Sequence, residues 1–185
     1  MGESIFFNKK QYFWVREALE IAETLAEDYF RVDLGDYERF PYDLQTLANL
    51  RVLEKTQRAL AQVCKYEYYK RESFSKFKGR EFYRICLQDD KILNTVQTES
   101  SSLLRPLLLC IVTHELIHVI RFSLDPKKFY LKLQEKRMEE SDVHQTTYEL
   151  LKYLKDPQVG FFLDLYRPRR EEGGLDSKGP ALDNI

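Results

Sequence analysis

The amino-acid sequence predicts a mainly helical α+β domain, with one small antiparallel β-hairpin or sheet beside a buried helix. Three observations lead to this prediction. Apolar residues recur at helical spacing near both ends of the chain. Residues 82–96 are instead rich in aromatic and β-branched residues, which favours strands. The segment 103–120 is the most apolar stretch of the chain and fits a helix in the core.

The first expected element is an amphipathic helix over residues 8–30. Asn8 can cap it, and Gln11 stands three residues later, as a capping box requires. A loop is expected over residues 31–42, after which Asp43 opens a second long helix that reaches about Lys70. The apolar stripe predicted for this second helix consists of Leu44, Leu47, Leu50, Leu53, Leu60 and Val63.

A β-hairpin is expected next. Residues 71–79 are polar and end in a glycine, which predicts a loop before the first strand. The stretches 82–87 and 91–96 are the two predicted strands, and Asp89-Asp90 between them is the predicted turn.

Helices are expected again in the rest of the chain. Ser100, Ser101 and Ser102 can cap a helix over residues 103–122. Asp125-Pro126 marks another helix start, with Asp at the N-cap and Pro at the first helical position, and the helical pattern runs to about Lys155.

The pair Asp156-Pro157 repeats this device and opens a short helix that ends near Tyr166. We therefore expect a single domain over residues 1–168, in which residues 1–75 form a helical N-terminal section and residues 76–168 form a second section. Residues 169–185 are charged and contain glycine and proline, so they are expected to form a flexible tail.

Composition argues against several classes of function. Among the 185 residues, 29 Lys and Arg are balanced by 30 Asp and Glu, so no overall positive field favours nucleic acid. The apolar segment 103–120 carries too many polar groups for a membrane span, and no signal peptide is recognisable. Three scattered cysteines, Cys64, Cys86 and Cys110, predict reduced thiols and a cytoplasmic location. The oligomeric state is left open.

The segment His114-Glu115-Leu116-Ile117-His118 carries the strongest functional signal. Two histidines four residues apart lie on one face of a helix, so both imidazoles can bind one metal ion. Glu115 projects to the flank of the same site, where it can accept a proton from a metal-activated water. Burying two histidines and a carboxylate without a partner is costly. The motif therefore predicts a divalent metal site, with zinc as the expected ion.

A zinc site needs a third protein ligand, and two candidates lie on the following helix. His144 is the only other histidine of the chain, Glu140 precedes it by four residues, and Tyr148 follows it by four. Either Glu140 or His144 can be the third ligand, while the other orients a ligand. His144 or Tyr148 can donate a hydrogen bond to the developing oxyanion, so Tyr148 joins Glu115 as a candidate catalytic residue.

Helix length adds a constraint on this site. If residues 126–154 formed one straight helix antiparallel to the motif helix, His144 would miss the motif by about 20 Å. The second helix is therefore expected to break or to cross at a steep angle, with the break around residues 134–136.

The motif and the downstream helical Glu140 resemble the zincin metallopeptidases, and within them the gluzincin group. The resemblance covers about residues 80–155, and gluzincins often carry an acidic residue at the position of His144. It implies one zinc per chain, Glu115 as general base and acid, and hydrolysis of peptide bonds in a peptide or protein substrate. It also implies a sheet before the motif helix whose edge strand pairs with the substrate backbone.

Two other functions fit some of these residues. Glu115 to His118 is also a Glu-x-x-His pattern of di-metal (iron) carboxylate bundles, for which the chain offers further carboxylates at Glu17, Glu20, Glu23, Glu27 and Glu54. A second such pattern is missing, since Ser141 occupies the place it needs before His144. A binding protein that keeps a zincin-like site without turnover is the third possibility.

Overall fold

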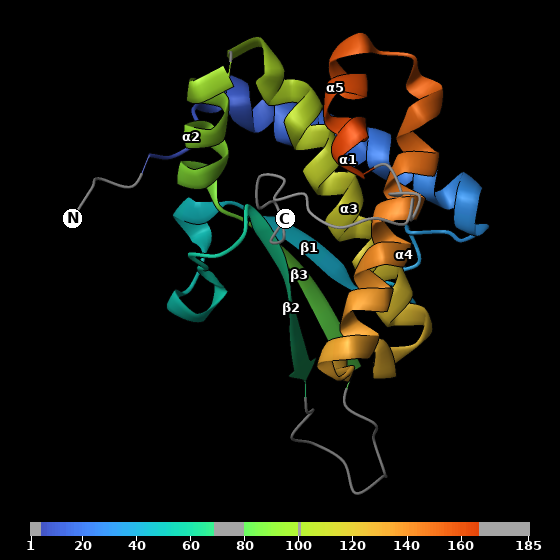
Figure 1. The fold of residues 1–185 in the computed structure, drawn as a ribbon. Coiled ribbons are helices and arrows are strands. Elements are labelled where there is room, and N and C mark those ends of the chain that lie inside the picture. Colours follow the sequence, from blue (N-terminus) through green and yellow to red (C-terminus); the bar gives the residue numbers. More distant parts are fainter. Residues whose placement is uncertain (1–4, 69–79, 100, 167–185) are drawn as a thin grey trace, which may run out of the picture.

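The computed structural model describes residues 5–68, 80–99 and 101–166. The segment 69–79, which contains the loop expected over residues 71–79, and the tail expected over residues 169–185 lie outside these residues. Within them the chain is a mainly helical α+β structure with a three-stranded sheet, as Figure 1 shows.

Helix α1 spans Lys9–Phe30, as predicted. The Asn8 side chain accepts a hydrogen bond from the Gln11 backbone N–H at 3.0 Å, and the Gln11 side chain accepts one from the Asn8 N–H at 2.8 Å. The helix ends at Arg31, whose backbone has the left-handed conformation (φ 55°). Its buried face consists of small residues, Val15, Ala18, Ala22 and Ala26, which let α3 pack closely against it.

The helix predicted over residues 43–70 is wrong. This stretch forms strand β1 (Tyr42–Gln45), two short 3₁₀ turns, η1 (Leu47–Asn49) and η2 (Val52–Glu54), and strand β2 (Ala61–Tyr68). Leucines spaced by three residues fit 3₁₀ turns, which have three residues per turn, as well as an α-helical stripe.

The predicted β-hairpin is half correct. The segment predicted as its first strand lies within β3 (Arg80–Leu87), but the segment predicted as its second strand lies within helix α2 (Asp89–Glu99). Ile92, Leu93 and Val96 share one face of α2 and are buried there. Asp89 is the first residue of α2 rather than a residue of a hairpin turn, and it accepts hydrogen bonds from the backbone N–H groups of Phe7 and Leu47.

The sheet is mixed rather than antiparallel, with strand order β1-β3-β2. Strand β3 lies in the centre, parallel to β1 (Tyr42 opposite Tyr83) and antiparallel to β2 (Ala61 opposite Leu87). Because side chains alternate along a strand, Tyr83, Ile85 and Leu87 face the main core. The sheet therefore joins strands from both sides of residue 75.

The second half of the chain is helical. It begins with the 3₁₀ turn η3 (Ser101–Leu103) and continues through α3 (Leu104–Leu124), η4 (Pro126–Tyr130), α4 (Leu133–Leu151), η5 (Lys152–Leu154) and α5 (Pro157–Tyr166). The N-cap of α3 is Leu103, which makes no side-chain cap hydrogen bond, and not one of the three predicted serines. The predicted Asp156-Pro157 start of α5 is confirmed, since Asp156 accepts hydrogen bonds from the backbone N–H groups of Gln158 and Val159.

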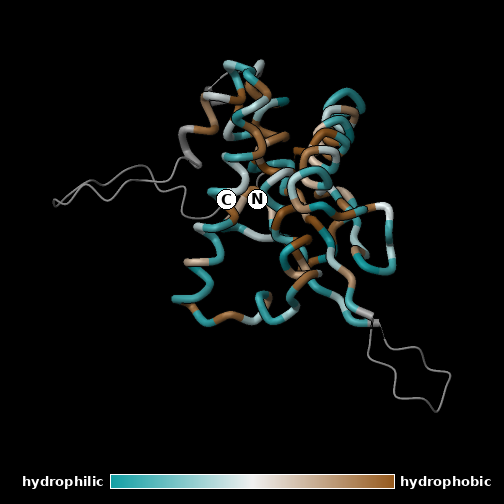
Figure 2. Tube along the Cα trace, turned by 90° about the vertical axis from the view of Figure 1, so that its right-hand side faces the viewer, coloured by the Kyte–Doolittle hydropathy of each residue, from teal (hydrophilic) through white to brown (hydrophobic). Residues whose placement is uncertain are grey.

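Helix α3 is the centre of the molecule. It contacts α1, α4, α5, β2 and β3, and most of its residues are buried and apolar. By length and composition it is the one helix among the described residues that could cross a membrane, and 78% of its most apolar stretch is buried inside the protein. Figure 2 shows that hydrophobic residues lie mainly toward the interior of the described part of the molecule.

Candidate metal centre

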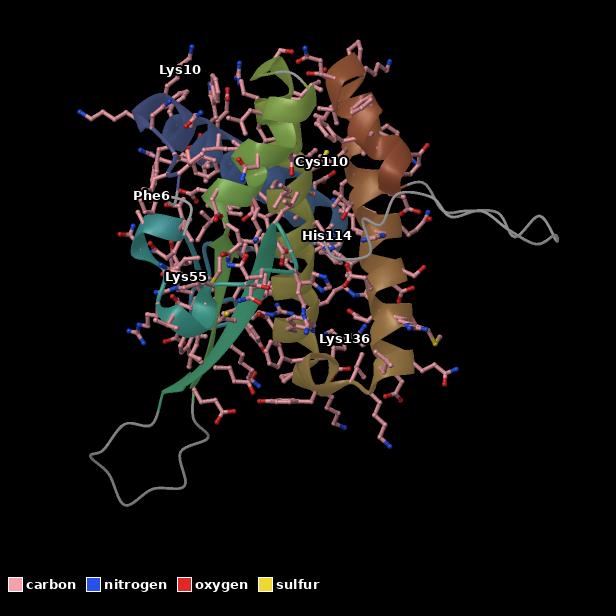
Figure 3. All side chains as sticks on the ribbon, turned by 60° about the vertical axis from the view of Figure 1, so that its left-hand side comes forward. Phe6, Lys10, Lys55, Cys110, His114 and Lys136 are labelled. Atoms are coloured by element: carbon pink, nitrogen blue, oxygen red, sulfur yellow. The ribbon has the colours of Figure 1, made fainter. Side chains whose placement is uncertain are left out.

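The two motif histidines lie on the side of α3 that faces α4, where Figure 3 shows His114. His114 has no solvent exposure, and the His118 side chain is 12% exposed. The His118 ring stacks on Phe122, one turn further along α3, with 5.3 Å between the ring centroids. Packing around α3 therefore holds both imidazoles in place before any metal ion binds.

The helical structure is interrupted between α3 and α4, as the helix-length constraint requires. Asp125 caps η4 by accepting a hydrogen bond from the Lys127 N–H at 3.2 Å, and Pro126 follows it. Leu131 and Lys132 are extended, and α4 begins at Leu133. The break thus lies a few residues before the predicted range 134–136. It starts the second helix anew and lets α4 carry its polar residues alongside the motif.

Glu140 completes a three-residue group with the two histidines. Its Oε1 lies 2.9 Å from His114 Nε2, and its Oε2 lies 3.2 Å from His118 Nε2. The donor atoms of the three residues lie within 4.8 Å of one another. Donors around a tetrahedral zinc with bonds of about 2.0–2.1 Å are separated by roughly 3.3 Å. The group therefore fits a single metal ion, and two imidazoles with one carboxylate are a known catalytic zinc donor set.

His144 lies beside this group without belonging to it. Its Nε2 is 3.3 Å from Glu140 Oε1, and its ring centroid is 5.0 Å from that of His114. Of the two predicted third ligands, the geometry therefore favours Glu140, with His144 next to the ligand carboxylate. The side chains of Glu140 and His144 are 34% and 32% exposed, so the group is open to solvent on the α4 side.

The electrostatics of the group suit metal binding. Burial lowers the pKa of His114 to about 4, which keeps the imidazole in the neutral form that binds metals. Burial alone would raise the pKa of Glu140, but hydrogen bonds with His114, His118 and His144 outweigh this effect and hold the pKa well below its usual range. Glu140 is therefore a carboxylate at neutral pH.

Glu115 is buried beside the group and is not one of its donors. Burial raises the pKa of its carboxyl to about 7, and the nearby charge of Glu140 adds to the increase. A carboxyl group with a pKa near neutrality can both accept and return a proton. This is the property that the predicted general base requires.

Tyr148 lies two turns after Glu140 on α4. It is partly buried against the main core, and its ring lies 5.9 Å from the Lys152 ammonium. The role predicted for Tyr148 in catalysis remains a prediction.

The carboxylates offered for a di-metal centre lie elsewhere. Glu17 pairs with Arg105, Glu20 with Arg16, Glu23 accepts a hydrogen bond from Tyr42, Glu27 accepts one from the Leu34 N–H, and Glu54 pairs with Arg84. Among the described residues, His114, His118 and Glu140 form the one group of metal-binding side chains. The arrangement thus favours one metal ion over two.

Sequence reasoning missed an ionic network next to the group. Arg121, three residues after His118, binds Glu139, the residue before Glu140. Burial alone would raise the pKa of Glu139, but its hydrogen bonds with Arg121 and Lys128 outweigh this effect and lower the pKa. The signal in the sequence was an arginine near the end of a mostly apolar helix, since a charged residue needs a partner when it is buried.

No family model matches the chain, and neither a curated protein nor a solved structure matches it.

Proposed function

We propose that this chain is a zinc-dependent metallopeptidase of the gluzincin type. His114, His118 and Glu140 hold the ion, and Glu115 is the general base. The observation that carries the proposal is the meeting of these three donors beside a fourth, buried group that is not a donor. A core helix gains nothing in stability from several buried titratable groups, so their presence favours catalysis.

Glu115 has the central chemical role in this proposal. A bound zinc ion would polarise both the attacking water and the scissile carbonyl. The Glu115 carboxylate takes the proton from that water and then delivers it to the leaving amine nitrogen. Solvent reaches the centre past Glu140 and His144, which are each about one-third exposed. His144, whose Nε2 lies 3.3 Å from Glu140 Oε1, is the better candidate to donate a hydrogen bond to the oxyanion.

The sheet supports a peptide as the substrate. Strand β2 lies at the edge of the sheet, is antiparallel to β3 and contacts α3. An edge strand offers unpaired backbone groups to an extended peptide. Pairing of this kind is what the resemblance to gluzincins implies.

Metal content and turnover of the purified full chain test the proposal. We expect one zinc per chain by elemental analysis, lost in His114→Ala and His118→Ala. Glu115→Gln should keep the metal and lower hydrolysis of a fluorogenic peptide library by at least about 10²–10⁴-fold. A wild-type chain without metal would overturn the proposal. Loss of metal in Glu115→Gln would favour a di-metal centre, and zinc without hydrolysis would favour a binding protein.

A further inference from the structure

The network around Arg121 spans the three elements that carry or connect the metal-binding residues. Arg121 lies on α3, one turn after His118. Its guanidinium binds both oxygens of Glu139, at 2.5 and 2.8 Å, and an oxygen of Asp142 at 2.9 Å. The Lys128 ammonium, from η4, lies 2.7 Å from the same Glu139 carboxylate.

The network flanks the third ligand. Glu139 directly precedes Glu140 on α4, and Asp142 follows it by two residues. A two-pronged contact between a guanidinium and a carboxylate fixes orientation as well as distance. Arg121 therefore holds the turn of α4 that bears Glu140 against the turn of α3 that follows His118.

Because the Arg121–Glu139 pair is largely buried, stabilisation of the fold alone explains the pair poorly. The side chains of Glu139 and Arg121 are 7% and 18% exposed. Removing two charges from water costs about as much as their attraction returns, so apolar residues of similar size often stabilise as well or better. The known use of such pairs is to fix the register between packed elements.

We infer that Arg121 and Glu139 are positioning residues for the proposed zinc centre. They set the spacing between α3 and α4 at which Glu140 meets His114 and His118. The inference rests on the proposed function, because it needs a metal at these three residues. It predicts that zinc affinity depends on the ion pair more strongly than the stability of the metal-free chain does.

The double variant Arg121→Met/Glu139→Met separates the two roles. Methionine fills a similar volume without charge, so the metal-free chain should unfold at about the wild-type temperature or above it. Zinc affinity, measured by competition with a chromogenic chelator, should fall by about 10–100-fold, as for other groups that orient metal ligands. Arg105→Met, which breaks the exposed Arg105–Glu17 pair, is the matched control and should leave affinity unchanged.

Arg121→Lys covers the case in which the double variant does not fold. Lysine keeps the charge but cannot bind both oxygens of Glu139 in the same fixed geometry, so affinity should again fall while the fold is retained. Wild-type affinity in Arg121→Lys or in a folded double variant overturns the inference and leaves the proposed function intact. A wild-type chain that binds no zinc overturns the proposed function and the inference with it.

Discussion

Glu140 and His144 occupy successive turns of α4, yet the structure gives them different positions. Both Glu140 oxygens point at the motif imidazoles, whereas the His144 Nε2 lies 3.3 Å from the Glu140 carboxylate and its ring centroid is 5.0 Å from that of His114. The residue types alone could not separate them, because glutamate and histidine are equally acceptable zinc ligands. Which of the two side chains faces the imidazoles depends on how α4 is rotated about its axis. The break before Leu133 sets this rotation.

Alanine substitutions at these two positions should differ in effect. Glu140→Ala should strip the metal, because two histidines alone bind zinc weakly. His144→Ala should lower zinc affinity by only about 10–100-fold. Elemental analysis after gel filtration, followed by chelator competition, measures both. Metal retained in Glu140→Ala and lost in His144→Ala would reverse the assignment.

Glu54 offers a test of stability far from the metal centre. Its buried carboxylate binds Arg84, and the Tyr66 hydroxyl donates a hydrogen bond to it. Burial alone would raise the pKa of Glu54, but these partners outweigh it and lower the pKa. The unfolded chain therefore takes up the proton first on acidification. The contribution of Glu54 is present above an unfolded pKa of about 4.3 and is lost as pH falls through the folded pKa.

The variant Glu54→Gln should consequently be less stable than the wild type at pH 7, by up to about 3–5 kcal/mol. The difference should shrink as pH falls below about 4, because the unfolded wild-type chain then takes up a proton that the folded chain binds only at lower pH. Urea unfolding at a series of pH values measures it. A difference that is constant with pH would show that the charge of Glu54 is not what stabilises the fold.

At the scale of elements, several patterns that local chemistry determines were predicted correctly, although the N-cap of α3 is Leu103 and not one of the expected serines. The Asn8–Gln11 capping box and the Asp-Pro starts of η4 and α5 act within a few residues, so their sequence signals suffice. Residues 43–70 and 91–96 were assigned wrongly because their apolar spacing fits more than one structure. For residues 43–68, the structure that forms depends on β3, the strand that pairs with both β1 and β2.

Leucine substitutions in the misassigned region distinguish the two structures. Leu47 is 4% exposed and Leu53 is 92% exposed, although both belong to the stripe expected to be buried. Leu47→Ala should cost about 2–5 kcal/mol of unfolding free energy, since it leaves a cavity. Leu53→Ala should change it by less than about 0.5 kcal/mol. Equal losses in chemical denaturation would support the helix instead.

At the scale of the whole molecule, the proposed centre links helices α3 and α4, which carry its donors. Zinc that binds only the folded chain should stabilise it by about 2.7 kcal/mol at a free concentration 100 times the Kd. Each kcal/mol raises the Tm of a chain of this size by roughly 2–4 °C. Chelation should therefore lower the Tm by several degrees, and added zinc should restore it. His114→Ala should show no zinc-dependent shift in the same scans.

The break between α3 and α4 also has a kinetic consequence. All three proposed donors and Glu115 lie within residues 114–140, on two helices joined by the short turn η4. His114 and Glu140 are 26 residues apart, so bringing them together costs less chain entropy than pairing β1 with β3, where Tyr42 and Tyr83 are 41 residues apart; only β2 and β3 meet over a shorter separation, with Tyr68 opposite Arg80. The helix pair can thus form before β1 joins the sheet. A refolding chain would acquire its ion early, and zinc would then speed folding as well as oppose unfolding.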